Sequence, residues 1–244
     1  MSQEPRVTYY VIMPATKESD VSGLRPVSRL LQEEEADAKK RFENPTFQVL
    51  RRYAKKGNAE SFATQLTALG IDAFVVSDTQ IAGHLFLWAE TANQGAGGMA
   101  FRDFSGQPLY CPFEDILAVC VGPARRVDGS ETLLVDLHRR STPITPRIDT
   151  AFFDFAAITG EAGADAYGFL EKLRQKIGTI EIDLQFNDVA QHLVPALRKG
   201  LATLPGEFGP PEDKMPSPYD GKSVKLFGVY SFLAREFEIQ KAAS

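Results

Sequence analysis

The chain has 244 residues, of which 43% are hydrophobic and 24% are charged, and its formal net charge is −5. This apolar content is enough to bury a core, which argues against disorder, and the length suits one large domain or two small ones. The acidic balance argues against nucleic-acid binding, which depends on clustered Lys and Arg. Two cysteines are too few for a disulfide framework, and their spacing matches no zinc pattern, so a reducing cytoplasm is the expected location.

The first 83 residues are predicted to form a small αβ sandwich. Residues 7–13 are rich in β-branched and aromatic side chains and stop at a proline, which is typical of a strand. Helix-forming residues dominate 27–42, and apolar residues recur at helical spacing over 62–69, before a glycine. Residues 71–76 then favour another strand. A helix packed over two such strands buries the apolar faces of both.

Residues 84–204 are predicted to form a strand-rich unit closed by helices. Asp165 can cap a helix over 166–177 that carries apolar residues on one face, and this helix is expected to cover the sheet. A further strand is expected over 179–186 and a last helix over 187–204. The other strand-like segments, separated by turn residues, are 85–91, 99–104, 109–111, 116–121, 132–138 and 144–149. The whole chain is therefore predicted to be an α+β protein.

Residues 205–244 are predicted to form a linker followed by an aromatic segment. The Pro and Gly density of 205–222 favours a stretch without regular structure. The apolar residues beyond it are Phe227, Tyr230, Phe232, Leu233 and Phe237. If they are exposed, these side chains are expected to bind a protein partner. The alternatives are that the segment folds back on its own core as a strand or helix, or that it docks on a second copy of the chain.

The middle unit carries an ordered series of segments at 97–122, 131–140 and 164–178. The first reads GGMAFRDFSGQPLYCPFEDILAVCVG, the second ETLLVDLHRR and the third ADAYGFLEKLRQKIG. In this order of a hairpin, a PFEDI corner, further strands and a closing helix, residues 85–178 resemble the pleckstrin-homology-like domains of many bacterial proteins. The first unit, with LGIDAFVVSD at 69–78, looks like the small ferredoxin-like domains that precede such modules. The resemblance implies binding or scaffolding and no reaction.

No motif in the sequence predicts a catalytic, cofactor or metal site. The three histidines match neither HxxxH nor HExxH, and GxSxG and SxxK are absent. The glycine-rich stretch at 94–98 lacks the lysine of a P-loop and the spacing of a dinucleotide site. We therefore expect no cofactor.

Two weaker sets of candidate residues remain. Arg139, Arg140 and Arg147 could form an anion-binding patch. His138, Asp136 and Asp149 are polar residues within apolar strands and could form a catalytic site if the fold joined them.

The sequence as a whole predicts a non-enzymatic binding or scaffolding protein, such as an accessory subunit of a larger assembly. A sensor for a small anion and an enzyme with a site assembled from distant residues are the alternatives. The partner is expected to be a protein or a second copy of the chain, bound through the C-terminal segment. No signal peptide and no transmembrane span are expected, because no long apolar stretch occurs.

Overall fold

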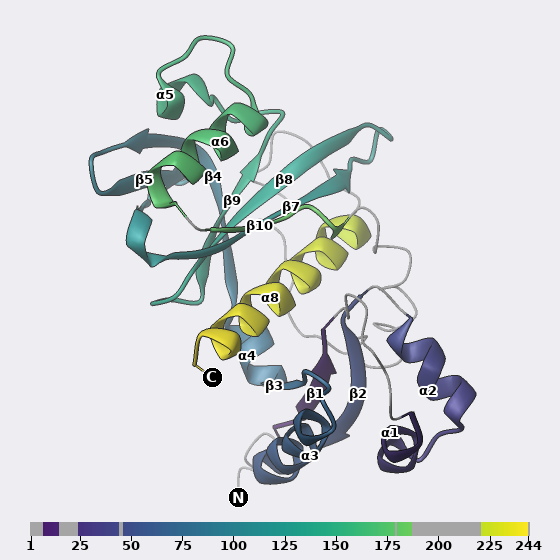
Figure 1. Ribbon diagram of the computed structural model, residues 1–244. Coiled ribbons are helices and arrows are strands. Elements are labelled where there is room, and N and C mark those ends of the chain that lie inside the picture. Colours follow the sequence, from purple (N-terminus) through teal and green to yellow (C-terminus); the bar gives the residue numbers. More distant parts are fainter. Residues whose placement is uncertain (1–6, 15–23, 44–45, 179, 187–220, 244) are drawn as a thin grey trace, which may run out of the picture. The chain divides into compact units, whose positions relative to one another are not determined.

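Figure 1 shows the computed structural model, which describes residues 7–14, 24–43, 46–178, 180–186 and 221–243. The chain divides into two compact units, residues 1–83 with 189–206 and residues 84–188 with 207–244. Helices and strands occur in both units, so the predicted α+β class is confirmed. The helix predicted over 187–204 and the predicted linker up to residue 220 lie outside the described residues.

The first unit is built on a three-stranded antiparallel sheet in the order β2-β1-β3. β1 is the middle strand, and apolar side chains on it pack against side chains of the first three helices to form the core of this unit. The strands are β1 (Tyr9–Met13), β2 (Gln48–Tyr53) and β3 (Phe74–Ser77), and the helices are α1 (Leu24–Leu31), α2 (Glu35–Phe42), α3 (Lys56–Ala68) and α4 (Asp78–Gly83).

Two features of the first unit differ from the prediction. The single helix predicted over 27–42 is wrong: α1 ends at Leu31 because Gln32 has a φ of 60°, in the left-handed region that cannot continue a right-handed helix. β2 was not predicted, since its adjacent arginines interrupt any apolar pattern. In the structure the Arg51 guanidinium lies 4.9 Å from the centre of the Phe62 ring, so this cation covers an aromatic side chain.

The second unit is built on a seven-stranded sheet in the order β10-β7-β8-β9-β4-β5-β6. Its neighbours are antiparallel except for the pairs β4–β9 and β10–β7, which are parallel. The strands are β4 (Leu85–Gln94), β5 (Gly98–Asp103), β6 (Pro108–Pro112), β7 (Ile116–Arg125), β8 (Glu131–Arg139), β9 (Ile144–Asp149) and β10 (Glu181–Asp183). The six strands predicted between 85 and 149 are confirmed, whereas the strand predicted over 179–186 is confined to three residues.

Three α-helices of the second unit lie within the described residues. They are α5 (Ala156–Thr159), α6 (Ala166–Ile177) and α8 (Gly221–Ala243), and a short 3-10 turn covers Phe113–Asp115. The prediction placed 205–244 in a segment of its own. In the structure the described part of that segment is α8, which packs along β7 and belongs to the second unit.

The predicted cap of α6 is confirmed, because the Asp165 side chain accepts a hydrogen bond of 2.9 Å from the Gly168 backbone N–H. Asp165→Ala is therefore expected to lower the free energy of unfolding by about 1 kcal/mol, the usual effect of losing such a cap. Urea denaturation measures the change. Asp165→Asn keeps an acceptor oxygen and is the matched control, and an equal loss in both variants would contradict this role of the cap.

The described helices also bear on the expectation that the chain spans no membrane. None of the helices in the described residue ranges combines the length and the apolar character that a membrane crossing requires.

Candidate functional site

The two faces of the seven-stranded sheet differ in chemistry. Side chains alternate between the faces along a strand, and on β8 Val135 and Leu137 enter the apolar core that also holds Phe169 of α6. Asp136 and His138 therefore point to the opposite face. We call this opposite face the polar face, and its members are Cys120 on β7, Asp136 and His138 on β8, and Thr145, Arg147 and Asp149 on β9.

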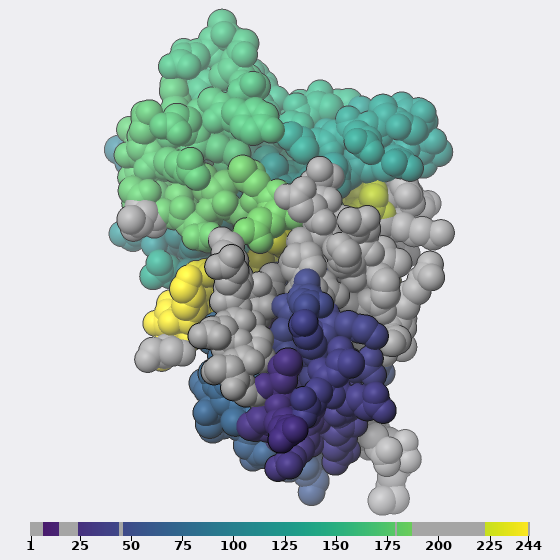
Figure 2. Space-filling model, turned by 45° about the vertical axis from the view of Figure 1, so that its right-hand side comes forward, coloured from purple at the N-terminus to yellow at the C-terminus, as the bar shows by residue number. Residues whose placement is uncertain are grey.

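Helix α8 lies on the polar face and runs along β7 (Figure 1). A glycine makes the close approach possible, because a Cβ atom at Gly122 would lie only 2.6 Å from Cδ2 of Phe227. All residues from 227 to 236 are buried. Figure 2 shows the bright yellow C-terminal end of α8 at the surface, where Lys241 and the two residues after it are exposed.

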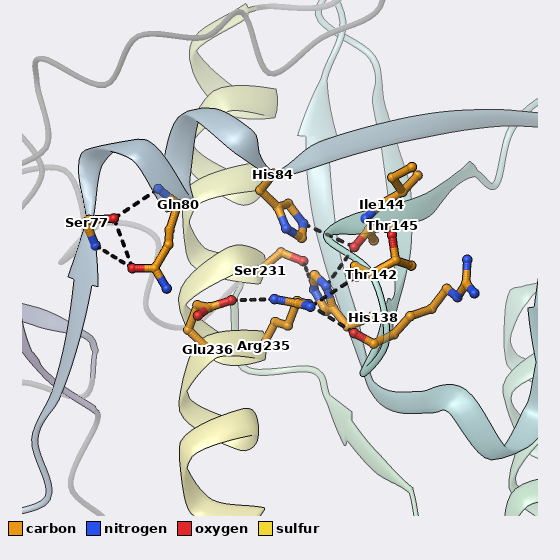
Figure 3. Close-up of polar contacts among 11 residues, drawn as sticks. Ser77, Gln80, His84, His138, Thr142, Ile144, Thr145, Ser231, Arg235 and Glu236 are labelled. Carbon is orange, nitrogen blue, oxygen red and sulfur yellow. Dashed lines mark hydrogen bonds and ion pairs between the residues drawn. The ribbon is translucent and has the colours of Figure 1, made fainter. Parts of the chain in front are cut away.

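A chain of hydrogen bonds between imidazole and hydroxyl groups joins α8 to three segments of the sheet (Figure 3). Ser231 Oγ lies 2.6 Å from Nε2 of His138, and Nδ1 of the same ring lies 3.0 Å from Thr145 Oγ1. Thr145 Oγ1 lies 3.1 Å from Nε2 of His84, which immediately precedes β4. The first three residues have no exposed surface, and His84 is 3% exposed. The hydroxyl–imidazole contacts are therefore sealed inside the molecule.

Both histidines in this series of hydrogen bonds, His84 and His138, are held in the neutral state. Burial, followed by the charges of Arg235 and Arg147, lowers the pKa of His84 to about 3. Burial also lowers the pKa of His138 well below its ordinary value, and His84, Arg235 and Arg147 add to that shift. A neutral imidazole has one donor and one acceptor nitrogen, and a hydroxyl can act in either role. The contacts among these four side chains can thus form without any charge on them, while Nδ1 of His84 is buried without a hydrogen-bond partner among the described residues.

A buried ion pair lies beside the histidines. Arg147 donates two hydrogen bonds to the carboxylate of Asp136, of 2.7 and 2.6 Å, and neither side chain is exposed. Aromatic rings surround the guanidinium carbon, which lies 3.8 Å from the ring centre of Phe86, 5.5 Å from Trp88 and 5.1 Å from Phe227. Because Phe227 belongs to α8, the docked helix helps to enclose this pair.

The last turns of α8 are fixed to the loop between β8 and β9. Arg235 donates hydrogen bonds to the carbonyl oxygens of Arg139, at 3.2 Å, and of Thr142, at 3.1 Å (Figure 3). Its third contact is an ion pair with the neighbouring Glu236. At the opposite end of the helix, Ser223 accepts a hydrogen bond of 2.9 Å from the backbone N–H of Arg125. The helix is thus held by polar contacts near both ends and at its centre.

Tyr230 supplies one more attachment, because its hydroxyl donates a 2.6 Å hydrogen bond to the carboxylate of Asp183 on β10. Burial and the Asp183 charge raise the pKa of Tyr230, so the phenol keeps its proton. Tyr230→Phe is expected to lower the free energy of unfolding by about 1–2 kcal/mol, since a charged acceptor loses its donor. Urea denaturation measures this loss. Tyr167→Phe, at a residue that is 64% exposed, should change nothing, and an equal effect in both variants would contradict the prediction.

The structure places the predicted partner-binding residues inside the molecule. Phe227, Tyr230, Phe232 and Leu233 are buried, and Phe237 is half-buried. Phe227 and Tyr230 pack on the ring of Phe186, and Phe232 packs on His84. The segment is folded back on its own unit as a helix, which was one of the alternatives left open by the sequence.

The three arginines predicted to bind an anion do not form one patch. Arg139 is paired with Asp115 at 2.8 Å, Arg147 is paired with Asp136, and Arg140 is exposed. Strand alternation puts Arg139 and Arg147 on opposite faces of the sheet. Two of the three cations are therefore already neutralised by carboxylates of the chain itself.

The three residues considered for catalysis share the polar face, and each is bound to a different partner. His138 is hydrogen-bonded to Ser231 and Thr145, and Asp136 is bound by Arg147. Asp149 accepts a hydrogen bond of 2.5 Å from Thr132 and lies 3.4 Å from Arg126. The fold thus uses each of the three in a separate structural contact.

Sequence reasoning missed most of the residues that join α8 to the sheet. His138 and Asp136 were noticed as polar residues in an apolar strand, and that signal was informative. Ser231, Thr145 and Arg235 carry no such signal, because each stands in a segment where a polar residue is unremarkable. Their role becomes visible only when residues about 90 positions apart are brought together, as Ser231 and His138 are.

The described residues contain no group of three or more His, Cys, Asp or Glu side chains that could hold a metal ion. Comparisons of the chain with protein-family models, with curated proteins and with solved structures found no match. The resemblance to pleckstrin-homology-like and ferredoxin-like domains therefore stays a prediction.

Proposed function

We propose that this protein is a non-enzymatic binding or scaffolding protein of the cytoplasm, acting as an accessory subunit of a larger protein assembly. The observation that carries the proposal is the use made of Ser231 and His138. A serine hydroxyl 2.6 Å from a neutral imidazole is the arrangement of a nucleophile and its base, but here neither residue has any exposed surface. Their contact attaches a helix to a sheet, which is a structural use of groups that can also do chemistry.

Exposed apolar side chains of the second unit support a binding role. Val127, at the turn between β7 and β8, is 67% exposed, and Phe152, just after β9, is 46% exposed. The guanidinium carbon of Arg126 lies 4.5 Å from the ring centre of Phe152. Aromatic residues and arginine are enriched in protein interfaces, where they form many of the energetically dominant contacts. We call Arg126, Val127 and Phe152 the hairpin patch, and we propose that it contacts the protein partner.

The test is affinity purification of the tagged full-length chain from its native cells, followed by size-exclusion chromatography with light scattering. We expect a protein partner that stays bound in a fixed stoichiometry. Val127→Asp combined with Phe152→Ser should release this partner, because a charge and a lost ring remove the apolar contact. Tyr167→Asp, at another exposed aromatic residue, is the control and should leave the complex intact.

Each outcome of this experiment decides something. A chain that purifies alone as a monomer from its native cells would overturn the accessory-subunit proposal. A partner that remains bound to the hairpin variant would leave the binding function standing but would exclude the hairpin patch as its surface.

A further inference from the structure

Helix α8 and the main apolar core of the second unit are separate layers. The core cluster lies between α6 and the other face of the sheet, and α8 contributes none of the described residues that form it. Cys111 is a member of that core, whereas Cys120 is buried on the polar face, on the strand β7 along which α8 packs. Removing α8 would therefore uncover Cys120 and leave the layer that contains Cys111 in place.

The charges around His138 are balanced before any proton is added. On β9 and β8, Arg147 is paired with Asp136, and on α8, Arg235 is paired with Glu236. Among the described residues, His84 before β4 also acts on His138 and is itself neutral. Elsewhere on the polar face, burial raises the pKa of Cys120 on β7, and Asp183 on β10 is bound by Tyr230.

Within the described part of the chain, the His138 ring is hydrogen-bonded to two hydroxyl groups and to no carboxylate, and the ring has no exposed surface. A proton on His138 would therefore place an additional buried positive charge beside Arg147 and Arg235. Such a charge is strongly unfavourable in a buried site.

We propose that α8 is an acid-released helix: when His138 takes up a proton, α8 leaves the polar face while the core covered by α6 stays folded. The released helix presents Phe227, Tyr230 and Phe232, which the docked helix buries. Release thus changes the apolar surface that a partner can reach. Only this last consequence rests on the proposed binding function, because the release itself involves the chain alone.

The direction of the pH dependence follows from the state in which His138 can accept a proton. In the docked state its pKa is well below the ordinary value, and in the released state water restores a value of about 6.5. Docking is therefore strongest above this pH and weakens as the pH falls through it. For one histidine, the released fraction rises about tenfold per pH unit below about 6.5, which gives a factor of about 30 between pH 7.5 and 5.0.

The two cysteines allow local release to be distinguished from global unfolding in the unmodified chain. We would label the full-length protein with 4,4′-dithiodipyridine between pH 7.5 and 5.0, map the labelled peptides by mass spectrometry, and divide each rate by that of the urea-unfolded chain at the same pH. The normalised rate at Cys120 should rise about 30-fold, and the rate at Cys111 should not follow it. A labelling rate at Cys120 that does not change with pH, or labelling rates that rise equally at both cysteines, would overturn the proposal.

Histidine variants identify the group that takes up the proton. His138→Gln should remove the rise at Cys120, while His192→Gln, at the third histidine of the chain, should leave the rise unchanged. A rise that persists in His138→Gln would show that another group is responsible, and the proposal would fail. If His138→Gln already exposes Cys120 at pH 7.5, the pH dependence of Cys120 labelling in the wild-type chain decides. A labelling rate that changes tenfold per pH unit below about 6.5 supports the proposal, and a much weaker dependence on pH rejects it.

The measurement needs no partner, so its failure can be told apart from failure of the proposed function. Labelling that is independent of pH, in a chain that still purifies with a stoichiometric protein, would reject acid release alone. A chain that purifies alone but shows the pH-dependent labelling of Cys120 would keep the release and reject the accessory-subunit function.

Discussion

Asp136→Asn is expected to lower the free energy of unfolding by about 3–5 kcal/mol, because it leaves the Arg147 guanidinium charged, buried and without its counter-ion. Both side chains are fully buried, so water cannot replace the lost carboxylate. Urea denaturation at pH 7 measures the change. The fluorescence of Trp88, the single tryptophan of the chain, is a local probe, since its ring centre lies 5.5 Å from the Arg147 guanidinium carbon.

A double-mutant cycle separates the pair from its surroundings. Arg147→Met should destabilise the protein by a similar amount, because Asp136 is then the unpaired buried charge. The combination of Asp136→Leu with Arg147→Met removes both charges and should recover most of the loss. Glu60→Gln, which breaks the exposed pair between Lys56 and Glu60, should cost less than about 0.5 kcal/mol. Losses below 1 kcal/mol in both buried single variants would contradict this account.

Gly122→Ala is expected to loosen α8 from the sheet and to lower the free energy of unfolding by about 1–3 kcal/mol, the usual effect of overpacking. The new Cβ atom would lie 2.4 Å from Cδ1 of Phe186 and 2.6 Å from Cδ2 of Phe227. Both are ring atoms that pack on each other at a centroid distance of 5.0 Å, so neither ring can move without disturbing the other. Hydrogen exchange of the α8 amides, together with urea denaturation, measures the effect.

The direction in which Gly122→Ala changes the free energy of unfolding is informative, because alanine normally stabilises a strand relative to glycine by about 0.5–1 kcal/mol. Gly57→Ala, in the first turn of α3, is the matched control, since a Cβ atom there meets nothing within 4 Å. That variant should be neutral or slightly stabilising. A stabilised Gly122→Ala protein with unchanged exchange in α8 would show that the helix does not approach β7 as closely as the structure indicates.

Local pattern was sufficient to predict much of the strand order of the second unit. Val135 and Leu137 alternate with Asp136 and His138, and a period of two is a property of the strand itself. The cap at Asp165 was equally predictable, because a side-chain acceptor three residues before a backbone donor acts within one turn. Signals of this kind need only neighbours in the sequence.

Local pattern failed where the decisive contact is distant. β2 has an uneven sequence and forms because β1 offers unpaired backbone groups along its edge. The C-terminal segment could be read as a strand, a helix or an exposed tail, since its apolar residues mark no single face. Its conformation depends on the sheet that it covers, and that sheet is formed by residues about 90 positions earlier.

The α+β class, the strands between 85 and 149 and the helix over 166–177 could be predicted, because they follow from composition, periodicity and capping within short stretches. The roles of the polar residues in those strands became visible only in the folded protein. Alternation placed Asp136 and His138 on one face, but it could not show that Arg147, Thr145 and Ser231 would meet them there. The physical reason is that a buried polar group must find its partner in space, and the chain that supplies that partner can come from any part of the sequence.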